Sequence, residues 1–125
     1  MPPTLLIVED EFFVRVTTAD FLRDAGYEVV EAGNADEALE IFKSGAAIDL
    51  LFTDVRMPGS MDGCELARRV RLDWPSVRVI VTSGYSESLL AARSACEDLV
   101  LPKPYRPQAV LTQVRAMIGA DISPN

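Results

Sequence analysis

The most restrictive feature of the chain is an uninterrupted apolar run that ends on a carboxylate. Residues 50–53 are Leu-Leu-Phe-Thr, Asp54 follows directly, and Met57-Pro58-Gly59 then breaks the run. Strands covered on both faces lack polar alternation, and proline and glycine are typical of turns. We therefore expect a buried central strand that delivers Asp54 to a loop. A lone aspartate can equally be a turn residue, so the other strand ends have to decide its role.

Apolar runs recur along the chain, and segments with helical spacing of apolar residues separate them. Five repeats of strand and helix predict an α/β fold with a doubly wound, five-stranded parallel sheet and helices on both faces. We expect one domain over 1–125, with a folded core at 4–119 and a tail at 120–125. The expected strands are 4–8, 27–32, 50–53, 77–82 and 99–102, and the expected helices are 12–25, 34–45, 62–74, 86–96 and 107–119.

Composition excludes several classes of protein. The 19 acidic and 12 basic residues give a net charge of -7, which disfavours direct binding of nucleic acid, and the chain contains no histidine. No apolar run is long enough to span a bilayer and no signal peptide is evident, so we expect a cytoplasmic protein without membrane insertion. Cys64 and Cys96 lie far apart in the sequence, and we expect both to be reduced.

The ends of the predicted strands carry compatible chemistry. In an open doubly wound sheet, the carboxyl ends of the strands gather at one edge, where ligands bind. Three carboxylates there repel one another unless a proton or a divalent cation intervenes, and oxygen ligands favour Mg2+. Asp54 could then attack a phosphoryl group while a hydroxyl and an ammonium bind its oxygens. The converging residues are Glu9, Asp10, Asp54, Thr82 and Lys103.

Four motifs at these strand ends resemble those of the receiver domains of two-component response regulators, over about 120 residues of the chain. The resemblance implies a flavodoxin-like sheet in the order 2-1-3-4-5. It also implies that Asp54 is the phospho-acceptor, assisted by Thr82 and Lys103. The motifs are Val8-Glu9-Asp10-Glu11, Thr53-Asp54-Val55-Arg56-Met57-Pro58, Val81-Thr82-Ser83-Gly84 and Lys103-Pro104-Tyr105.

For the cofactor and partners, the resemblance implies Mg2+ held by Asp10, Asp54 and the backbone carbonyl of Arg56, with Glu9 acting through water. The phosphoryl donor would be the phosphohistidine of a histidine kinase or of a histidine phosphotransfer protein. Such a receiver is not an enzyme toward external substrates, because it catalyses only its own phosphorylation and dephosphorylation. Its output would be altered binding to a downstream protein, since the sequence shows no output domain after the last helix.

The sequence departs from the family pattern at two places. Ser60 lengthens the loop after Asp54, and Val100 stands three residues before Lys103, where many receivers carry a tyrosine or phenylalanine that acts as a switch. Tyr85 is a candidate for an alternative aromatic readout. Helical spacing turns Phe12 and Val16 away from the core, with Phe13 between them. The resemblance implies that the first helix and the loop after the lysine meet the kinase, so we expect Phe12, Phe13, Val16 and Tyr105 to form an apolar docking patch.

Other interpretations are open to experiment. The chain could be a stand-alone receiver or part of a hybrid histidine kinase. A constitutive interaction module with this fold would not be phosphorylated at all. A flavodoxin-like flavin protein would need a phosphate-binding cradle where this chain has three acids, and a haloacid-type phosphatase would need an aspartate where Arg56 stands.

Overall fold

The structure is a computed structural model that describes residues 2–55, 61–83, 99–102 and 104–118. The expected helix at 86–96, Lys103 and the tail at 120–125 lie outside the described residues. The elements are β1 (Thr4–Val8), α1 (Phe12–Asp24), β2 (Glu28–Ala32), α2 (Ala35–Lys43), β3 (Leu50–Asp54), α3 (Gly63–Asp73), β4 (Arg78–Ser83), β5 (Leu99–Pro102) and α5 (Pro107–Ile118). Strands and helices alternate from β1 to β4, as the sequence predicts.

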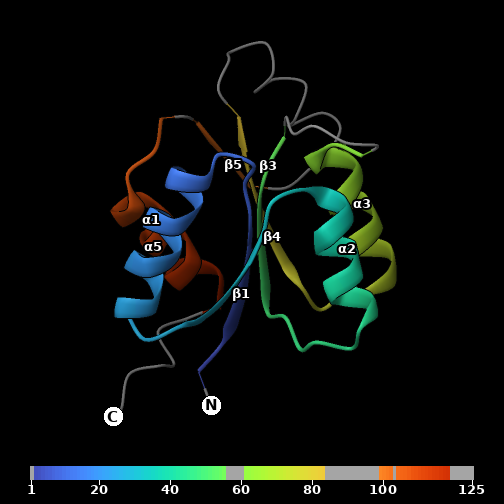
Figure 1. Cartoon of the computed structure of the whole chain (residues 1–125). Helices are drawn as coiled ribbons and strands as arrows, with labels where there is room; N and C mark the ends of the chain where they lie inside the picture. The colour runs from blue at the N-terminus through green and yellow to red at the C-terminus, as the bar shows by residue number, and fades with distance from the viewer. Residues whose placement is uncertain (1, 56–60, 84–98, 103, 119–125) are drawn as a thin grey trace.

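The five strands form one parallel sheet in the order β2-β1-β3-β4-β5, which confirms the expected order. Helices α1 and α5 cover one face of the sheet, and α2 and α3 cover the other (Figure 1). The carboxyl ends of all strands meet at one edge, because the strands are parallel. Among the predicted strand-end residues, this edge therefore carries Glu9, Asp10, Asp54 and Thr82.

Two apolar layers explain why the central strands lack polar alternation. Successive side chains of a strand point to opposite faces. In β1, Leu5 and Ile7 pack toward α1 and α5, whereas Leu6 and Val8 pack toward α2 and α3. Both faces of the strand are thus removed from water, and every residue of β3 is buried as well. The resulting frame fixes the height at which Asp54 leaves the sheet.

Side-chain caps and glycines define the helix ends. The side chains of Glu11, Asn34 and Asp62 each accept a backbone N–H of the helix that follows, at 2.8–3.0 Å. Such caps satisfy amide groups that the first helical turn leaves without partners. Gly26 and Gly45 follow α1 and α2 with φ of 108° and 90°, a conformation that favours glycine. The described helices therefore begin and end within two residues of the predicted bounds.

The expectation that both cysteines are reduced is wrong for Cys64, which is disulfide-bonded. Cys96 lies outside the described residues. The expectation rested on the separation of the two cysteines along the sequence, and sequence separation does not measure distance in space.

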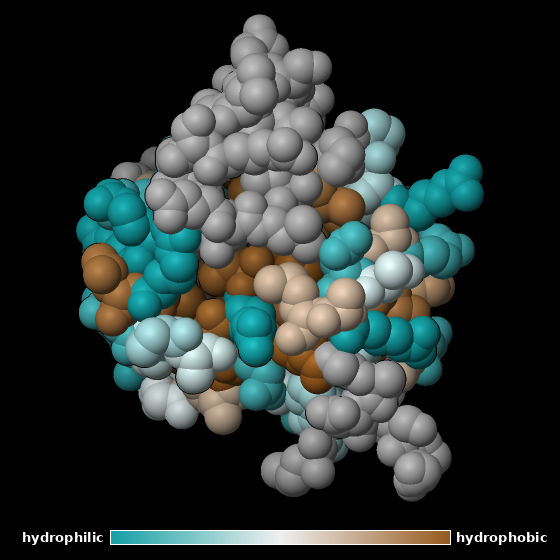
Figure 2. Space-filling model, turned by 180° about the vertical axis from the view of Figure 1, so that it is seen from behind, coloured by the Kyte–Doolittle hydropathy of each residue, from teal (hydrophilic) through white to brown (hydrophobic). Residues whose placement is uncertain are grey.

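The surface is mixed in character. Seen from behind, hydrophobic side chains reach the surface in the middle of the molecule, and hydrophilic ones surround them (Figure 2). Three large apolar side chains among the described residues are strongly exposed: Phe12 at 65%, Phe13 at 76% and Leu72 at 74%. None of the helices in the described ranges combines the length and the apolar character that a bilayer crossing requires.

Candidate functional site

Asp54 is the last residue of β3, and it is only 5% exposed. Its position in the sheet register is opposite Thr82 of β4. The backbone on both sides is fixed, since the Val55 N–H donates to the Thr82 carbonyl at 2.9 Å. The carboxylate therefore has a defined place at the edge of the sheet, next to a buried hydroxyl.

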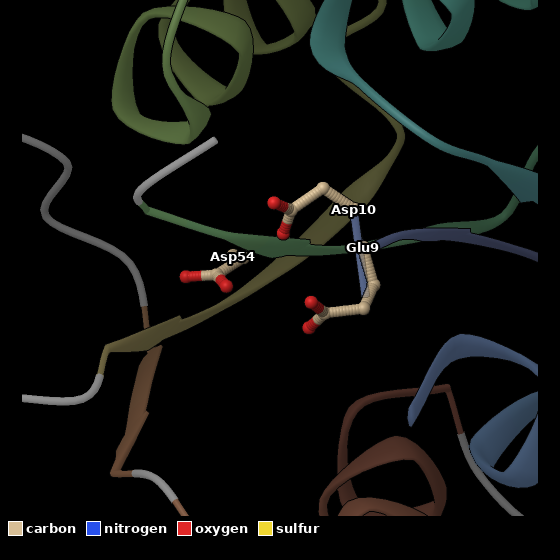
Figure 3. Close-up of side chains that lie close together, drawn as sticks. All are labelled: Glu9, Asp10 and Asp54. Carbon is tan, nitrogen blue, oxygen red and sulfur yellow. The ribbon is translucent and has the colours of Figure 1, made fainter. Parts of the chain in front are cut away.

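Two further carboxylates meet Asp54 at this edge. Val8 of β1 lies opposite Thr53 of β3, so the residues that follow the two strands leave the sheet at the same height. Glu9 is buried and Asp10 is exposed, and one oxygen from each lies within 4.8 Å of the other and of an Asp54 oxygen. Figure 3 shows the three side chains facing a common space beyond the strand ends. The predicted acidic cluster is confirmed as a spatial arrangement.

The chemistry of this donor set fits Mg2+. Carboxylate oxygens are hard ligands, and Mg2+ is usually bound by a few of them together with water and phosphate oxygens. The exposure of Asp10 leaves one side of the cluster open to such ligands. The Thr82 hydroxyl is fully buried and has no hydrogen-bond partner within the described parts of the chain. A buried hydroxyl of this kind is suited to bind an arriving oxygen anion.

Gly63, the first residue of α3, is a part of the site that sequence reasoning missed. Its N–H donates to the Val55 carbonyl at 2.9 Å. A Cβ atom at this position would lie 1.9 Å from the backbone oxygen of Asp54 and 3.1 Å from the Thr53 hydroxyl. Only glycine lets α3 begin directly against the backbone of Asp54. A glycine directly after Asp62, the cap residue of α3, was the available signal.

Arg15 of α1 is the second residue that was missed. Its Nη1 donates to the backbone carbonyl of Glu9 at 2.9 Å, and its Nε lies 3.2 Å from Glu31 of β2. An arginine four residues after Glu11 is ordinarily interpreted as a surface ion pair along the helix. The sequence therefore gave no sign that Arg15 reaches the backbone of the acidic segment.

Only some of the remaining predicted residues lie among the residues that the structure describes. Lys103, Arg56 and Tyr85 lie outside the described residues, so their predicted roles stay predictions. Val100 is in β5 opposite Val81. On the expected docking patch, Phe12 and Phe13 are strongly exposed and Val16 is half-buried, whereas Tyr105 is half-buried and packs edge-on against Phe52 with ring centroids 5.4 Å apart.

Comparison with known proteins gives a consistent result. The family model of the response regulator receiver domain matches residues 5–115. The sensor kinase CckA of Brucella abortus is 38% identical over 118 residues, which are 92% of this chain but 12% of that kinase. The chemotaxis protein CheY of Thermotoga maritima is 31% identical over 115 residues, which are 89% of this chain and 93% of that protein.

A solved structure agrees with these sequence matches. The response regulator protein TrrA of Thermotoga maritima was solved in complex with Mg2+-BeF. It superimposes with a TM-score of 0.80 at 28% identity, covering 92% of this chain and 98% of that chain.

Proposed function

Because the chain belongs to the response regulator receiver domain family, whose members accept phosphoryl groups in two-component signalling, we propose that Asp54 is its phospho-acceptor and that Mg2+ is its cofactor. The observation that carries this proposal is the convergence of Glu9, Asp10 and Asp54 within 4.8 Å at the edge of the sheet. The structure of TrrA with Mg2+-BeF supports the choice of metal.

The residues divide the reaction between them. A carboxylate oxygen of Asp54 attacks the phosphorus of the donor, the bond from phosphorus to the donor breaks, and an acyl phosphate forms on Asp54. Bound Mg2+ supplies positive charge that lets an anionic phosphoryl group approach an anionic nucleophile. Asp10, Asp54 and the backbone carbonyl of Arg56 would hold the ion, with Glu9 acting through water. The Thr82 hydroxyl binds one phosphoryl oxygen, and Lys103 binds another.

The donor in this proposal is a phosphohistidine on a histidine kinase or on a histidine phosphotransfer protein. The chain itself contains no histidine, so the partner has to supply it. Bond cleavage then leaves the donor imidazole free, and only the receiver is modified. Beyond catalysing its own phosphorylation and dephosphorylation, the domain turns over no external substrate in this proposal. A cytoplasmic location is part of the same proposal.

The relatives suggest two settings for this receiver domain. This chain matches 12% of a sensor kinase and 93% of a chemotaxis protein, so both a receiver within a larger kinase and a stand-alone receiver fit. In either case we propose that phosphorylation changes the affinity for a downstream protein. The net charge of -7 argues against direct binding of nucleic acid.

The first experiment is intact-mass measurement after incubation with acetyl phosphate and Mg2+. The native chain is expected to gain the mass of one phosphoryl group, and Asp54→Asn is expected to gain none. Glu40→Gln, which removes one charge from the exposed side of α2, serves as a control that should be modified like the native chain. An unmodified native chain would instead favour a constitutive interaction module.

We propose that the kinase docks on the α1 surface formed by Phe12, Phe13 and Val16, beside Tyr105. Two exposed phenylalanines in succession are unusual outside a binding surface, and they lie at the start of the helix that follows the acidic segment. A double variant, Phe13→Asp with Val16→Asp, leaves the Phe12 ring beside Arg15 in place. It is expected to slow phosphotransfer from the kinase at least tenfold, an effect of roughly 1.4 kcal/mol in transition-state binding.

The control for this docking prediction is Leu72→Asp. Leu72 is as exposed as Phe13 but belongs to α3, on the opposite face of the sheet. Acetyl phosphate should modify all the variants at the native rate, because a small donor needs no docking surface. Fast transfer from the kinase to the α1 double variant would contradict the prediction.

A further inference from the structure

The geometry of the acidic cluster depends on the turn that follows β1. In an extended strand, consecutive side chains point to opposite faces. Glu9 and Asp10 are consecutive, yet their carboxylates lie within 4.8 Å of each other and of Asp54. β1 ends at Val8, and the backbone bends at Asp10. The orientation of the Glu9–Asp10 peptide group therefore decides whether the two side chains converge.

Three hydrogen bonds within the described parts of the chain hold this turn. The Glu9 N–H donates to the Ala32 carbonyl of β2 at 3.1 Å, which continues the β1–β2 pairing. The Glu9 carboxylate accepts the N–H of Glu11 at 3.0 Å. The Glu9 carbonyl, which belongs to the Glu9–Asp10 peptide group, accepts from Nη1 of Arg15 at 2.9 Å. Of these three bonds, only the last acts directly on that peptide group.

Arg15 is itself held from several sides. Its Nε pairs with Glu31 at 3.2 Å, and its guanidinium lies over the Phe12 ring at 5.3 Å from the centroid. The side chain is only 18% exposed. Glu31 also pairs with Arg23 of α1 at 3.1 Å, so β2 is tied to α1 at two points. The planar guanidinium, with donors in several directions, can bind a carbonyl and a carboxylate at once.

We propose that Arg15 is a positioning residue of the Mg2+ site: it holds the Glu9–Asp10 peptide in the orientation that brings both carboxylates to Asp54. This inference rests on the proposed function, because it concerns the metal assigned to that site. Glu31 acts through Arg15, by fixing the guanidinium that reaches the Glu9 carbonyl. Arg15 touches neither metal nor phosphoryl group in this role.

If Arg15 acts through its charge, its removal should strengthen Mg2+ binding. If it acts by positioning the Glu9–Asp10 peptide, its removal should weaken Mg2+ binding. A positive charge beside a cation site weakens cation binding, so neutralising Arg15 would tighten Mg2+ binding if charge dominated. The Glu31 carboxylate, which Arg15 shares with Arg23, offsets part of that charge, and we expect the positioning effect to dominate. Removal of Arg15 then frees the peptide and weakens Mg2+ binding. The sign of the change thus separates the two explanations.

The test is titration of the metal-free chain with Mg2+ by calorimetry at fixed ionic strength. Replacing a residue that orients metal ligands typically costs 10–100-fold in affinity, so Arg15→Gln is expected to raise Kd about tenfold. Arg15→Lys keeps the charge but cannot reproduce the planar fork, and it should also raise Kd severalfold. The matched control is Arg23→Gln, which breaks the other ion pair to Glu31 without touching Glu9 and should leave Kd within about twofold of the native value.

The outcomes distinguish this inference from the proposed function. A native or lower Kd for Arg15→Gln overturns the positioning role, as does an equal rise for Arg23→Gln. If Arg15→Gln fails to fold, Arg15→Lys and Glu31→Gln decide in the same way, and urea unfolding of each variant reports any general loss of stability. By contrast, a native chain without Mg2+ affinity, or an Asp54→Asn chain with native affinity, would overturn the proposed metal site itself.

Discussion

Replacing Gly63 by alanine is expected to lower the free energy of unfolding by about 3 kcal/mol and to abolish phosphorylation of Asp54. The added Cβ would lie 1.9 Å from the backbone oxygen of Asp54 and 2.7 Å from its carbonyl carbon. Neither atom belongs to a flexible side chain that could turn away. Either α3 must move outward, which breaks the 2.9 Å bond from Gly63 to Val55, or the backbone of Asp54 must shift.

Both adjustments disturb the reaction centre, and this links the stability of the fold to its chemistry. Urea unfolding measures the loss of stability, and intact-mass measurement with acetyl phosphate and Mg2+ measures the loss of phosphorylation. Gly33→Ala is the matched control. Its Cβ would lie 3.4 Å from Arg15 Nη1 and 3.5 Å from Glu37 Oε1, both ordinary contacts with side chains. We expect a change within about 0.5 kcal/mol there. A native unfolding free energy for Gly63→Ala would contradict the argument.

The fold was predictable because the sequence signals of its strands and helices recur along the chain. Apolar runs with no polar alternation identified β1 and β3 as buried strands, and the structure buries Leu5–Val8 of β1 and all of β3. Helix caps at Asn34 and Asp62 and glycines after helices identified the ends of the elements. Parallel strands then bring their carboxyl ends together, so the meeting of Glu9 and Asp10 with Asp54 followed from the order of the sheet.

The features that were not predicted depend on tertiary contacts rather than on sequence patterns. The reach of Arg15 to the Glu9 carbonyl depends on how α1 lies on the sheet, and no spacing in the sequence encodes that distance. The contact of Gly63 with Asp54 depends likewise on where α3 begins in space. Cys64 shows the same limit, since a disulfide depends on proximity that sequence separation does not measure.

The acidic cluster leads to the second large effect, a strong dependence of stability on Mg2+. A ligand at 100 times its Kd that binds only the folded chain stabilises it by about 2.7 kcal/mol. Mg2+ needs the converged carboxylates, which exist only in the folded state, so the native chain is expected to gain this amount. Urea unfolding with and without Mg2+, at matched ionic strength, measures the gain.

Removal of the Asp10 carboxylate should raise the free energy of unfolding without Mg2+ and lower it with Mg2+. Two unit charges at 4.8 Å repel by roughly 3.5 kcal/mol at an effective dielectric constant of about 20, and water around the exposed Asp10 reduces this value. Asp10→Asn is therefore expected to raise the stability of the metal-free chain while removing most of the gain from Mg2+.

The matched control for this effect is Glu40→Gln, which removes the same charge from the exposed side of α2 and should keep the full gain from Mg2+. If Asp10→Asn keeps the gain as well, the cluster is not the metal site. Asp10→Asn could instead lose the stabilisation by Mg2+ and also destabilise the metal-free chain. That result would show that repulsion among the three carboxylates does not destabilise the metal-free fold. Relief of that repulsion would then not explain the stabilisation by Mg2+, and the role of Asp10 would be to maintain the turn after β1.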